Sequence, residues 1–451
     1  MGMKISSCIS AFLLLTACSG EPADTSHGTL DTNQDTTDVG TNESGDTDAG
    51  GVTEDPLSYY SHIQPIMQTY CTRCHQEGGL GVGDFTDPTM VDLFADIMMA
   101  RIDEGAMPPA VSDPSCNDYQ GSERMSMSAE DKETLRAWIN AGKPLGDIEQ
   151  QVEVPTIRDE LDDPDLEVRI NHPYTPLFND EDNPANEYRC FIVETGRDNP
   201  FYVTGIHPIV DQPALVHHIV LFKQQKGRFG DGYDPETGID CIDNMGGLGT
   251  GMISGWAPGM VPVEFPEGSG IEISPNEELV VQMHYFLPGP EWEGVADQSG
   301  YAFETTDQID TKLMMLPLGG RGFNIPGGDD DYGYTDSFTL PIIAPSITLY
   351  ATFPHMHVLG RSYRFWITKP NGEETCIAAS EKWDFNNQLT YVFKEPIELR
   401  GGETIHMECR WNNSRSNPNL IYDPPIDVTY GERTDEEMCF AFTLLHTPIQ
   451  F

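Results

Sequence analysis

Short apolar runs recur at close intervals in the residues beyond Pro155, and each run is broken by Gly, Pro or Asn. No long stretch there repeats its apolar residues with the 3.6-residue period of a helix. Runs of this length, bounded by turn residues, are typical of antiparallel β-sandwiches. The sequence therefore predicts that the larger, C-terminal part of the chain is all-β.

The preceding part, residues 57–147, has a pattern that predicts a small all-α domain. A short helix is expected over PLSYYSHIQPIMQTYC, and a longer one over SAEDKETLRAWINAGKP. In the second segment Ser128 is a helix-capping residue, acids occupy the first turn, and Gly142 and Pro144 mark the end. One face of this helix is apolar and includes Leu135, Trp138 and Ile139.

The N-terminal residues 1–17 have the pattern of an export signal. Lys4 precedes an apolar stretch that is far shorter than the ~20 residues needed to span a bilayer. The small residues before Cys18 resemble the lipobox of bacterial lipoproteins, in which that cysteine is acylated. The alternative is an ordinary cleaved signal with an incidental cysteine. Residues 18–56 lack Lys and Arg and are nearly free of apolar side chains, which predicts a disordered acidic tether.

The formal net charge of the 451-residue chain is -48, which argues against binding to nucleic acid or to anionic lipid. Membrane attachment would then depend on acyl chains at Cys18. We therefore expect an exported protein that is lipid-anchored in the cell envelope. Ser19 after the lipid cysteine favours the outer membrane by the general rules for lipoproteins.

The segment CTRCHQ contains Cys71 and Cys74, separated by two residues, and then His75. Two thiols at this spacing can add to the two vinyl groups of haem, and the histidine then binds the iron. A zinc half-site is the alternative, but no second cysteine pair follows at zinc-finger spacing. Residues 57–147 resemble class I cytochrome c domains, which implies one covalently bound haem c and electron transfer.

Met107, in the segment EGAMPPAV, is the predicted sixth ligand of the haem iron. A thioether is a soft iron ligand, and the two prolines that follow hold the chain extended. Met107 would otherwise pack in a loop, and the alternative ligands are Met67, Met90, Met98, Met99, Met125 and Met127.

Histidines occupy several of the predicted strands. In TFPHMHVLG, His355 and His357 point to the same face, because side chains alternate along a strand. In ALVHHIVLF, His217 and His218 would point to opposite faces, so they share a metal only where the strand ends or kinks. His284, in a separate strand, would complete an all-imidazole site with them.

His355 and His357 have no third imidazole nearby, and Met438 is the natural candidate for their third ligand. Imidazole with thioether favours copper, and the thioether favours Cu(I). Three imidazoles alone hold zinc equally well, so zinc with a hydrolytic function is an alternative. Met438 weakens that alternative because a thioether is a poor zinc ligand.

From about Glu160 to Phe451 the chain resembles the copper type II, ascorbate-dependent monooxygenases, the family of peptidylglycine α-hydroxylating and dopamine β-monooxygenases. The matching stretches occur in family order: Tyr188-Arg189-Cys190, His217-His218, Gln282-Met283-His284, His355-Met356-His357 with Leu359-Gly360, Cys409, and Asp435-Glu436-Glu437-Met438-Cys439. The resemblance implies two jelly-roll-like sandwiches over residues 155–305 and 306–451, one copper in each, facing across a solvent-filled cleft.

The resemblance also assigns roles to these residues. An electron-storing copper would be held by His217, His218 and His284. The copper that binds O2 and faces the substrate would be held by His355, His357 and Met438. The implied disulfides are Cys190–Cys241 and Cys409–Cys439, and this leaves Cys116 and Cys376 either free or paired across modules.

Hydroxylation of a C–H bond with O2 requires two electrons, and each copper stores one. Members of the family take these electrons from ascorbate, whereas the haem in this chain would be a built-in donor, with the external electron donor undefined. The expected function is hydroxylation of a small substrate by O2. The alternative is a non-catalytic haem and copper electron-transfer protein of the cell envelope.

Three phenylalanines are the predicted lining of the substrate pocket. Phe353 shares a strand face with His355, and Phe440 and Phe442 share a face with Met438. Peptide-amidating relatives have arginine, asparagine and tyrosine at these positions and grip a peptide carboxylate with them. Phenylalanines instead favour an apolar or aromatic substrate, so we predict that this chain does not amidate peptides.

Five further histidines are predicted to have structural roles, as is Met407. They are His62, His172, His207, His406 and His446. The acidic loop GGDDDYG, residues 327–333, is expected to be a solvated turn rather than a calcium site.

Overall fold

The computed structural model describes residues 56–76, 79, 81–109, 111–152, 161–179, 185–241, 251–257, 260 and 262–448. The predicted signal, the predicted lipid-attachment residue Cys18 and nearly all of the predicted tether lie outside the described residues. In the described part of the chain, no helix is long and apolar enough to cross a membrane.

The helices belong to residues 56–152, and each of the long ones starts at a side-chain cap. They are the π-helical turn η1 (Tyr59–Ile63), α1 (Gln64–Tyr70), α2 (Pro88–Asp103), η2 (Ser122–Arg124), α3 (Ala129–Asn140) and η3 (Ile148–Gln150). Asp87 caps α2 by accepting a hydrogen bond from the Thr89 amide, and Ser128 caps α3 by accepting one from the Asp131 amide. The apolar faces of α1, α2 and α3 meet in one small core that includes Met67, Leu135 and Trp138. No helix was predicted for the stretch that forms α2.

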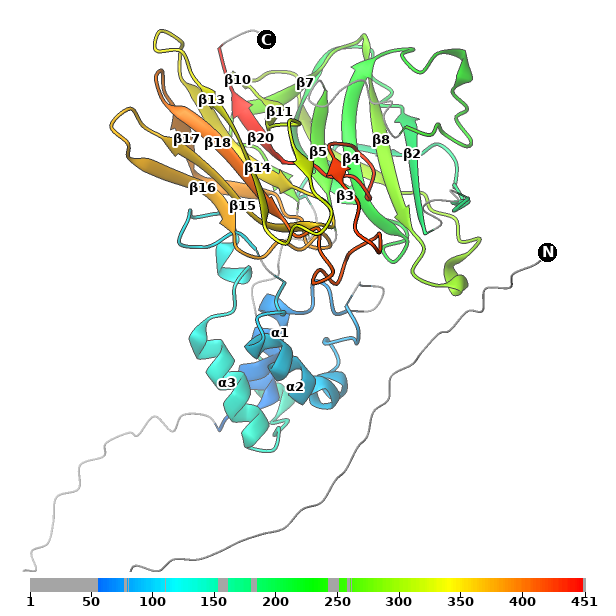
Figure 1. Ribbon diagram of the computed structural model, residues 1–451. Coiled ribbons are helices and arrows are strands. Elements are labelled where there is room, and N and C mark those ends of the chain that lie inside the picture. Colours follow the sequence, from blue (N-terminus) through cyan, green and yellow to red (C-terminus); the bar gives the residue numbers. More distant parts are fainter. Residues whose placement is uncertain are drawn as a thin grey trace, which may run out of the picture. The chain divides into compact units, whose positions relative to one another are not determined.

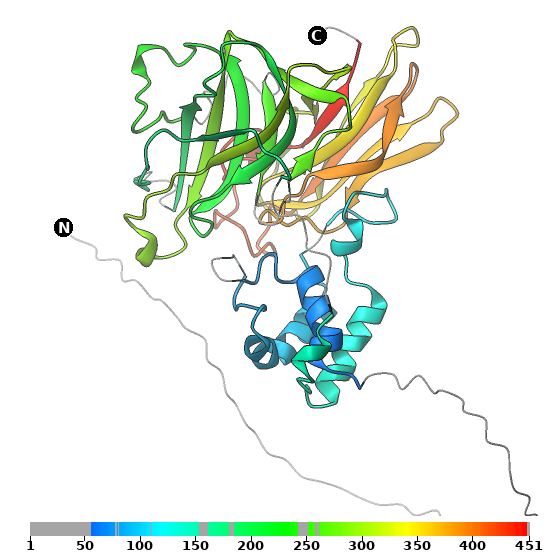
Figure 2. The same ribbon diagram turned by 180° about the vertical axis from the view of Figure 1, so that it is seen from behind.

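Residues 166–312 form the first β-sandwich, drawn in green in Figures 1 and 2. Its strands are β1 (Leu166–Arg169), β2 (Asn186–Val193), β3 (Phe201–Ile209), β4 (Val216–Gln225), β5 (Met252–Trp256), β6 (Val263–Glu264), β7 (Ser269–Ile273), β8 (Glu277–Phe286), β9 (Gly300–Thr306) and β10 (Thr311–Lys312), with 3-10 turns η4 (Gly230–Gly232) and η5 (Pro290–Trp292). One sheet has the order β1-β9-β3-β7-β10, with β6 on β3, and the other has the order β2-β8-β4-β5. The pairs are antiparallel except for β10 with β7.

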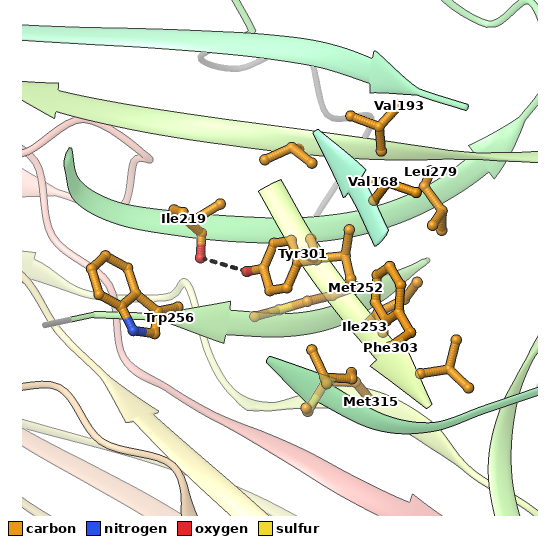
Figure 3. Close-up of a cluster of buried hydrophobic side chains, with 14 of the residues drawn as sticks. Val168, Val193, Ile219, Met252, Ile253, Trp256, Leu279, Tyr301, Phe303 and Met315 are labelled. Atoms are coloured by element: carbon orange, nitrogen blue, oxygen red, sulfur yellow. Dashed lines mark hydrogen bonds between the residues drawn. The ribbon is translucent and has the colours of Figure 1, made fainter. Parts of the chain in front are cut away.

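Side chains from both sheets fill the core of this sandwich, as Figure 3 shows. Tyr301 of β9 lies fully buried across this core, and its hydroxyl donates a hydrogen bond to the carbonyl of Ile219 on β4 over 3.5 Å. Trp256 of β5 lies at one side of the cluster in the same view. This packing holds β4 and β5 against the opposite sheet.

Residues 314–446 form the second sandwich, drawn from yellow to red. Its strands are β11 (Met314–Gly319), β12 (Asn324–Ile325), β13 (Tyr332–Thr339), β14 (Ile347–His355), β15 (Gly360–Thr368), β16 (Glu374–Ser380), β17 (Tyr391–Leu399), β18 (Thr404–Trp411), β19 (Val428–Thr429) and β20 (Phe440–His446). The sheets have the orders β11-β20-β14-β17 and β13-β18-β15-β16, and β12 pairs with β19. The prediction of antiparallel β-structure beyond Pro155 is therefore confirmed for these strands.

Strands β14 and β20 are buried on both faces, because each contributes to two cores. Leu349 belongs to the core of the second sandwich, whereas Ala351 and Phe353 belong to the cluster continuous with the first. The register of β14 shifts between Leu349 and Ala351 against both of its neighbours. Such irregularities often redirect side chains beside functional sites. Here the shift turns the residues from Ala351 onward toward the first sandwich.

Three disulfides are present among the described residues. Cys190–Cys241 and Cys409–Cys439 are the two pairs that the resemblance implied. Cys116 and Cys376, which the sequence left open, form the third, across 260 residues of chain. Around this third bridge, Tyr119 pairs with Phe393 of β17, and the Asp113 amide donates to the carbonyl of Ala379 on β16. The segment that precedes α3 is therefore attached to the edge of the second sandwich.

Candidate metal centres

The first candidate site consists of three histidines on two paired strands. The register of β4 against β8 shifts between Val216 and His218, and His218 lies directly opposite His284. The two Nδ1 atoms of that pair are 3.1 Å apart, and Nδ1 of His217 is 3.3 Å from Nδ1 of His218. The irregularity at His217 is the kink that two adjacent histidines need in order to face one point. The ligand atoms of all three residues lie within 4.8 Å of one another.

Hydrogen bonds on the far side of two rings fix which nitrogen carries hydrogen. Nε2–H of His217 donates to Oδ1 of Asn386 over 3.1 Å, and Nε2–H of His284 donates to Oδ1 of Asn186 over 2.7 Å. An amide oxygen can only accept, so both neutral rings present an unprotonated Nδ1 to His218. His218 has one Nδ1 hydrogen at most and cannot satisfy both, so the cluster fits a cation that accepts these lone pairs.

Burial lowers the pKa of His217 and lowers the pKa values of His218 and His284 well below the usual histidine range. Proximity of the rings to one another adds to this effect for His218 and His284, because two imidazolium charges would repel. The neutral imidazole is the form that binds metal, so the site is held in its ligand state at ordinary pH.

The second candidate site contains His355 and His357, which lie at the end of β14. The strand ends at His355, so His357 is placed by the turn that follows and not by strand alternation. The ring centroids are 5.1 Å apart. Nδ1–H of His355 donates to Oε1 of Gln388 over 2.6 Å, and Nδ1–H of His357 donates to the carbonyl of Glu436 over 2.9 Å. Both rings therefore keep Nε2 for a metal, and burial lowers their pKa values to about 3 and about 4.

Met438, the predicted third ligand, is 4 % exposed and lines the same cavity as His355 and His357. Its neighbour Glu437 is fully buried, and the carboxylate accepts hydrogen bonds from the backbone amides of His357 and Leu359 and from Nε1–H of Trp411. Burial raises the pKa of Glu437 to about 7. Glu437 thus ties the turn that contains His357 to the segment that contains Met438.

The cavity that these ligands share lies between the two sandwiches. His218 of the first candidate site lines it together with His355, His357 and Met438. Most of the remaining wall is apolar and aromatic, and includes Tyr188, Met252, Trp256, Phe353, Phe385 and Phe442. Among the described residues that line it there is no Lys or Arg, and Glu432 is the one acid.

Two of the three phenylalanines predicted to line the substrate pocket do line the cavity, and the third does not. Phe353 and Phe442 line the cavity. Phe440 does not: it is buried and packs against Phe442 and, edge to face, against Tyr430. Parity along β20 gave the correct face, but Phe440 lies opposite His355 in the register, where neighbouring rings cover it.

Several residues of the site were missed by the sequence analysis. They are the polar partners Asn186, Asn386 and Gln388. Tyr188 was part of a matching stretch but had no assigned role, and its ring stacks on His284 with centroids 4.1 Å apart. Asparagine and glutamine have no spacing rule that links them to distant histidines, so the sequence offered no signal for them.

The cysteine motif follows α1 and is described separately from these sites. Cys71 and Cys74 form no disulfide, and each is partly buried. Nδ1–H of His75 donates to the carbonyl of Val82 over 2.9 Å, and its ring stacks on Phe85. A Cβ at Gly81 would lie 2.5 Å from the His75 ring, so this position requires glycine. Met107 follows α2, and its side chain is 40 % exposed.

Three of the histidines predicted to be structural have local partners. His406 stacks on Trp366, His446 Nδ1–H donates to the carbonyl of Lys312, and His62 accepts from the amide of Ser58. In the acidic loop 327–333, Asp331 forms ion pairs with Arg361 and Arg410.

Comparison with known sequences gives two matches over the β-sandwiches. Residues 178–289 match the N-terminal domain of the copper type II ascorbate-dependent monooxygenases, and residues 332–451 match the C-terminal domain of the same family. Together the two matches cover about half of the chain.

Individual proteins similar to this chain have names that are consistent with the two domain matches. A human DBH-like monooxygenase protein 1 is 26 % identical over 304 residues, which is 61 % of this chain and 48 % of the relative. A mouse DBH-like monooxygenase protein 2 is 27 % identical over 251 residues, 51 % of this chain and 38 % of the relative. A Caenorhabditis briggsae tyramine beta-hydroxylase is 25 % identical over 285 residues, 58 % of this chain and 45 % of the relative.

The chain spans about half the length of these curated relatives. Among solved structures, a Paenibacillus xanthan lyase covers 58 % of this chain and 23 % of its own with 11 % identity and a TM-score of 0.16, which is too low to support an argument. Each domain match covers most of one sandwich, and together the two matches contain His217, His218, His284, His355, His357 and Met438. By its two β-domains, the chain belongs to the copper type II ascorbate-dependent monooxygenase family.

Proposed function

We propose that this protein hydroxylates a C–H bond of a small apolar or aromatic substrate with O2, and that it receives electrons through a covalently bound haem c. The reaction consumes R–H, O2, two electrons and two protons, and it yields R–OH and water. One oxygen atom enters the substrate, and the other leaves as water.

The observation that supports this proposal is the shared cavity. His218 from the first site and His355, His357 and Met438 from the second open onto one space with mostly apolar walls. A set of two imidazoles and a thioether is suited to Cu(I), and copper bound at the two sites would supply one electron each and the activation of O2. The protein's part is to hold the ligand rings neutral, present the chosen ring nitrogens, and exclude water with aromatic side chains.

The composition of the cavity wall supports an apolar or aromatic substrate. Phe353, Phe442 and Trp256 offer flat apolar surface, and no cationic side chain is available among the described lining residues to grip a carboxylate. This favours our expectation that the protein does not amidate peptides. A relative named tyramine beta-hydroxylase is compatible with a small aromatic substrate.

Residues 71–75 fit a covalent haem. Cys71 and Cys74 would hold the macrocycle, and the carbonyl of Val82 orients His75 so that Nε2 is left for the iron. Haem would supply one-electron transfer. Met107 as sixth ligand, Cys18 as lipid anchor, and an exported, outer-membrane location remain part of this proposal.

The first test is metal analysis and EPR of the purified full chain, in which two coppers and one haem are expected. The second is oxygen consumption and ¹⁸O incorporation with a panel of small aromatic and aliphatic compounds. Substrate-dependent incorporation of one ¹⁸O atom supports the proposal. Metal-loaded protein that consumes no oxygen with any compound would identify a non-catalytic electron-transfer protein instead. Stopped-flow mixing of reduced haem with oxidised copper tests the electron route, which requires haem oxidation coupled to turnover.

A further inference from the structure

One surface segment of the second sandwich contacts histidines of both candidate metal sites. This segment, Trp383–Gln388, lies between β16 and β17 and is called here the 383–388 segment. Nε1–H of Trp383 donates to the carbonyl of His357 over 2.9 Å, and Oε1 of Gln388 accepts from His355. Oδ1 of Asn386 accepts from Nε2–H of His217, a ligand of the other site on the other sandwich.

The ring of Phe385 adds a second connection between the sites. It stacks on His217 with ring centroids 5.2 Å apart and planes inclined by 24°, and it meets His357 edge to face at 6.1 Å. Nε2–H of Gln388 donates to the carbonyl of Phe385 over 2.8 Å. A continuous set of contacts therefore runs from His217 through Asn386, Phe385 and Gln388 to His355.

These contacts act on the atoms that decide metal affinity. The residue that accepts a hydrogen bond from the outer nitrogen of a metal-binding histidine fixes the orientation and tautomer of the ring. Metal binding immobilises the ring of His217, and the segment is held against that ring by Asn386 and Phe385. A restrained segment in turn restrains the rings of His355 and His357, so the second ion meets ligands that are already oriented.

The contact with His217 is separable from the fold of the segment itself. The turn is made by Asp384, which accepts from the amides of Asn386 and Asn387 through its side chain and its carbonyl respectively. The Asn386 side chain is exposed and takes no part in that turn. Its removal should therefore leave the folded structure intact.

We propose that the 383–388 segment couples the two metal sites, so that metal bound by His217, His218 and His284 strengthens metal binding by His355, His357 and Met438, with Asn386 and Phe385 as the coupling residues. By thermodynamic linkage, the second site strengthens the first by the same factor. The inference depends on the proposed function only in requiring metal at both sites, and it is independent of substrate and haem.

The test is titration of the full chain with Cu(I) against a competing chelator. Affinity at the His355, His357 and Met438 site is compared with the first site intact and with the first site destroyed by His284→Ala. We expect this change to weaken the second site by about 5- to 150-fold, the usual range for coupled sites. In an Asn386→Ala background the same change should have an effect of about two-fold or less, and Phe385→Leu should reduce the effect in the same direction.

The matched control is Asn371→Ala, an exposed loop asparagine of the same sandwich whose side chain accepts from the amide of Glu373. It should leave the coupling at the wild-type value. Equal coupling in wild type and Asn386→Ala would overturn the proposal, and would direct attention to the hydrogen bond between Tyr188 and Thr434. Two uncoupled copper sites in a protein that still hydroxylates would overturn the coupling alone, whereas a chain that binds no copper would overturn the proposed function as well.

Discussion

The two candidate metal sites present opposite nitrogens of their histidine rings. In the site on β4 and β8, amide oxygens hold Nε2 of His217 and His284, and the Nδ1 atoms converge. In the site at the end of β14, Nδ1 of His355 and of His357 is held, and Nε2 remains. Nδ1 is the nitrogen nearer the backbone. Because the Cβ atoms of a cross-strand pair such as His218 and His284 are close together, the Nδ1 atoms of the two rings can meet at one point. Nε2 lies farther from the backbone and suits ligands such as His355 and His357, which project from a strand end and the turn after it.

The two sites also differ in the elements that supply their ligands. The first site is made by neighbouring strands of one sheet, with the ring of Tyr188 stacked against His284. The second draws Met438 from just before β20 and two histidines from the end of β14, and both of these ligand segments border the apolar cavity. Both sites border that cavity, because His218 lines it as well, so they differ in how their ligands are placed and not in access to the cavity.

The largest expected effect is the loss of one site without the other. Met438→Leu keeps side-chain volume but removes the sulfur, and we expect Cu(I) affinity at the second site to fall by at least about 100-fold, since loss of an outer-shell partner alone costs about 10–100-fold. Turnover should fall in parallel, and the EPR signal of the three-histidine site should persist. Unchanged affinity in Met438→Leu would remove the methionine from the ligand set. The preserved volume limits the stability cost to about 1.5 kcal/mol or less.

The next effect concerns the partners that hold the rings. Gln388→Ala should weaken metal binding at the second site by about 10–100-fold, and Asn186→Ala should do the same at the first. Chelator competition measures both affinities in each variant. Asn371→Ala is the control, because this exposed side chain hydrogen-bonds only within its own loop, and it should retain both affinities. If either alanine variant weakened metal binding more at the opposite site than at its own, the assignment of Gln388 to the second site and of Asn186 to the first would be wrong.

A smaller effect is expected from loss of a disulfide, and the disulfides Cys409–Cys439 and Cys190–Cys241 should differ in their influence on metal binding. Replacing Cys409 and Cys439 by serine should lower the free energy of unfolding by about 2–4 kcal/mol and also weaken metal binding beside the neighbouring Met438. Replacing Cys190 and Cys241 should lower stability by a similar amount but leave the second site's affinity unchanged. Urea denaturation with copper titration distinguishes these outcomes.

The smallest effect is a pH dependence in the first sandwich. Asp297 is fully buried and accepts hydrogen bonds from the hydroxyls of Tyr285 and Ser299, and burial raises its pKa above the ordinary value of 3.8. An acid with a raised pKa in the folded state contributes stability below its unfolded pKa, and this contribution is lost as pH rises through the folded pKa. We therefore expect metal-free wild type to lose stability, relative to Asp297→Asn, as pH rises from about 4 toward 7. Urea midpoints across this range measure the difference, and parallel curves would show that Asp297 does not titrate differently on folding.

Local patterns in the sequence were sufficient for much of the fold and for the metal-binding residue types. Short apolar runs bounded by turn residues predicted the antiparallel strands, and the Ser128 cap with acids in the first turn predicted α3. Alternation also put Phe353 on the face of His355, because both follow the irregularity at Ala351. It also gave the correct face for Phe440, but it could not show that Tyr430 and Phe442 cover this ring and keep it out of the cavity.

The sequence by itself determined which groups are available: the strand periods, the paired thiols before His75, and imidazoles and a thioether whose chemistry favours copper. Only the tertiary structure decided which nitrogen each ring presents, that Cys116 pairs with Cys376, and that one segment reaches both sites. The physical reason is the distance along the chain over which each kind of interaction acts. Strand alternation and helix capping act between residues a few positions apart, whereas a hydrogen bond from His217 to Asn386 joins residues 169 positions apart and exists only after both sandwiches have packed.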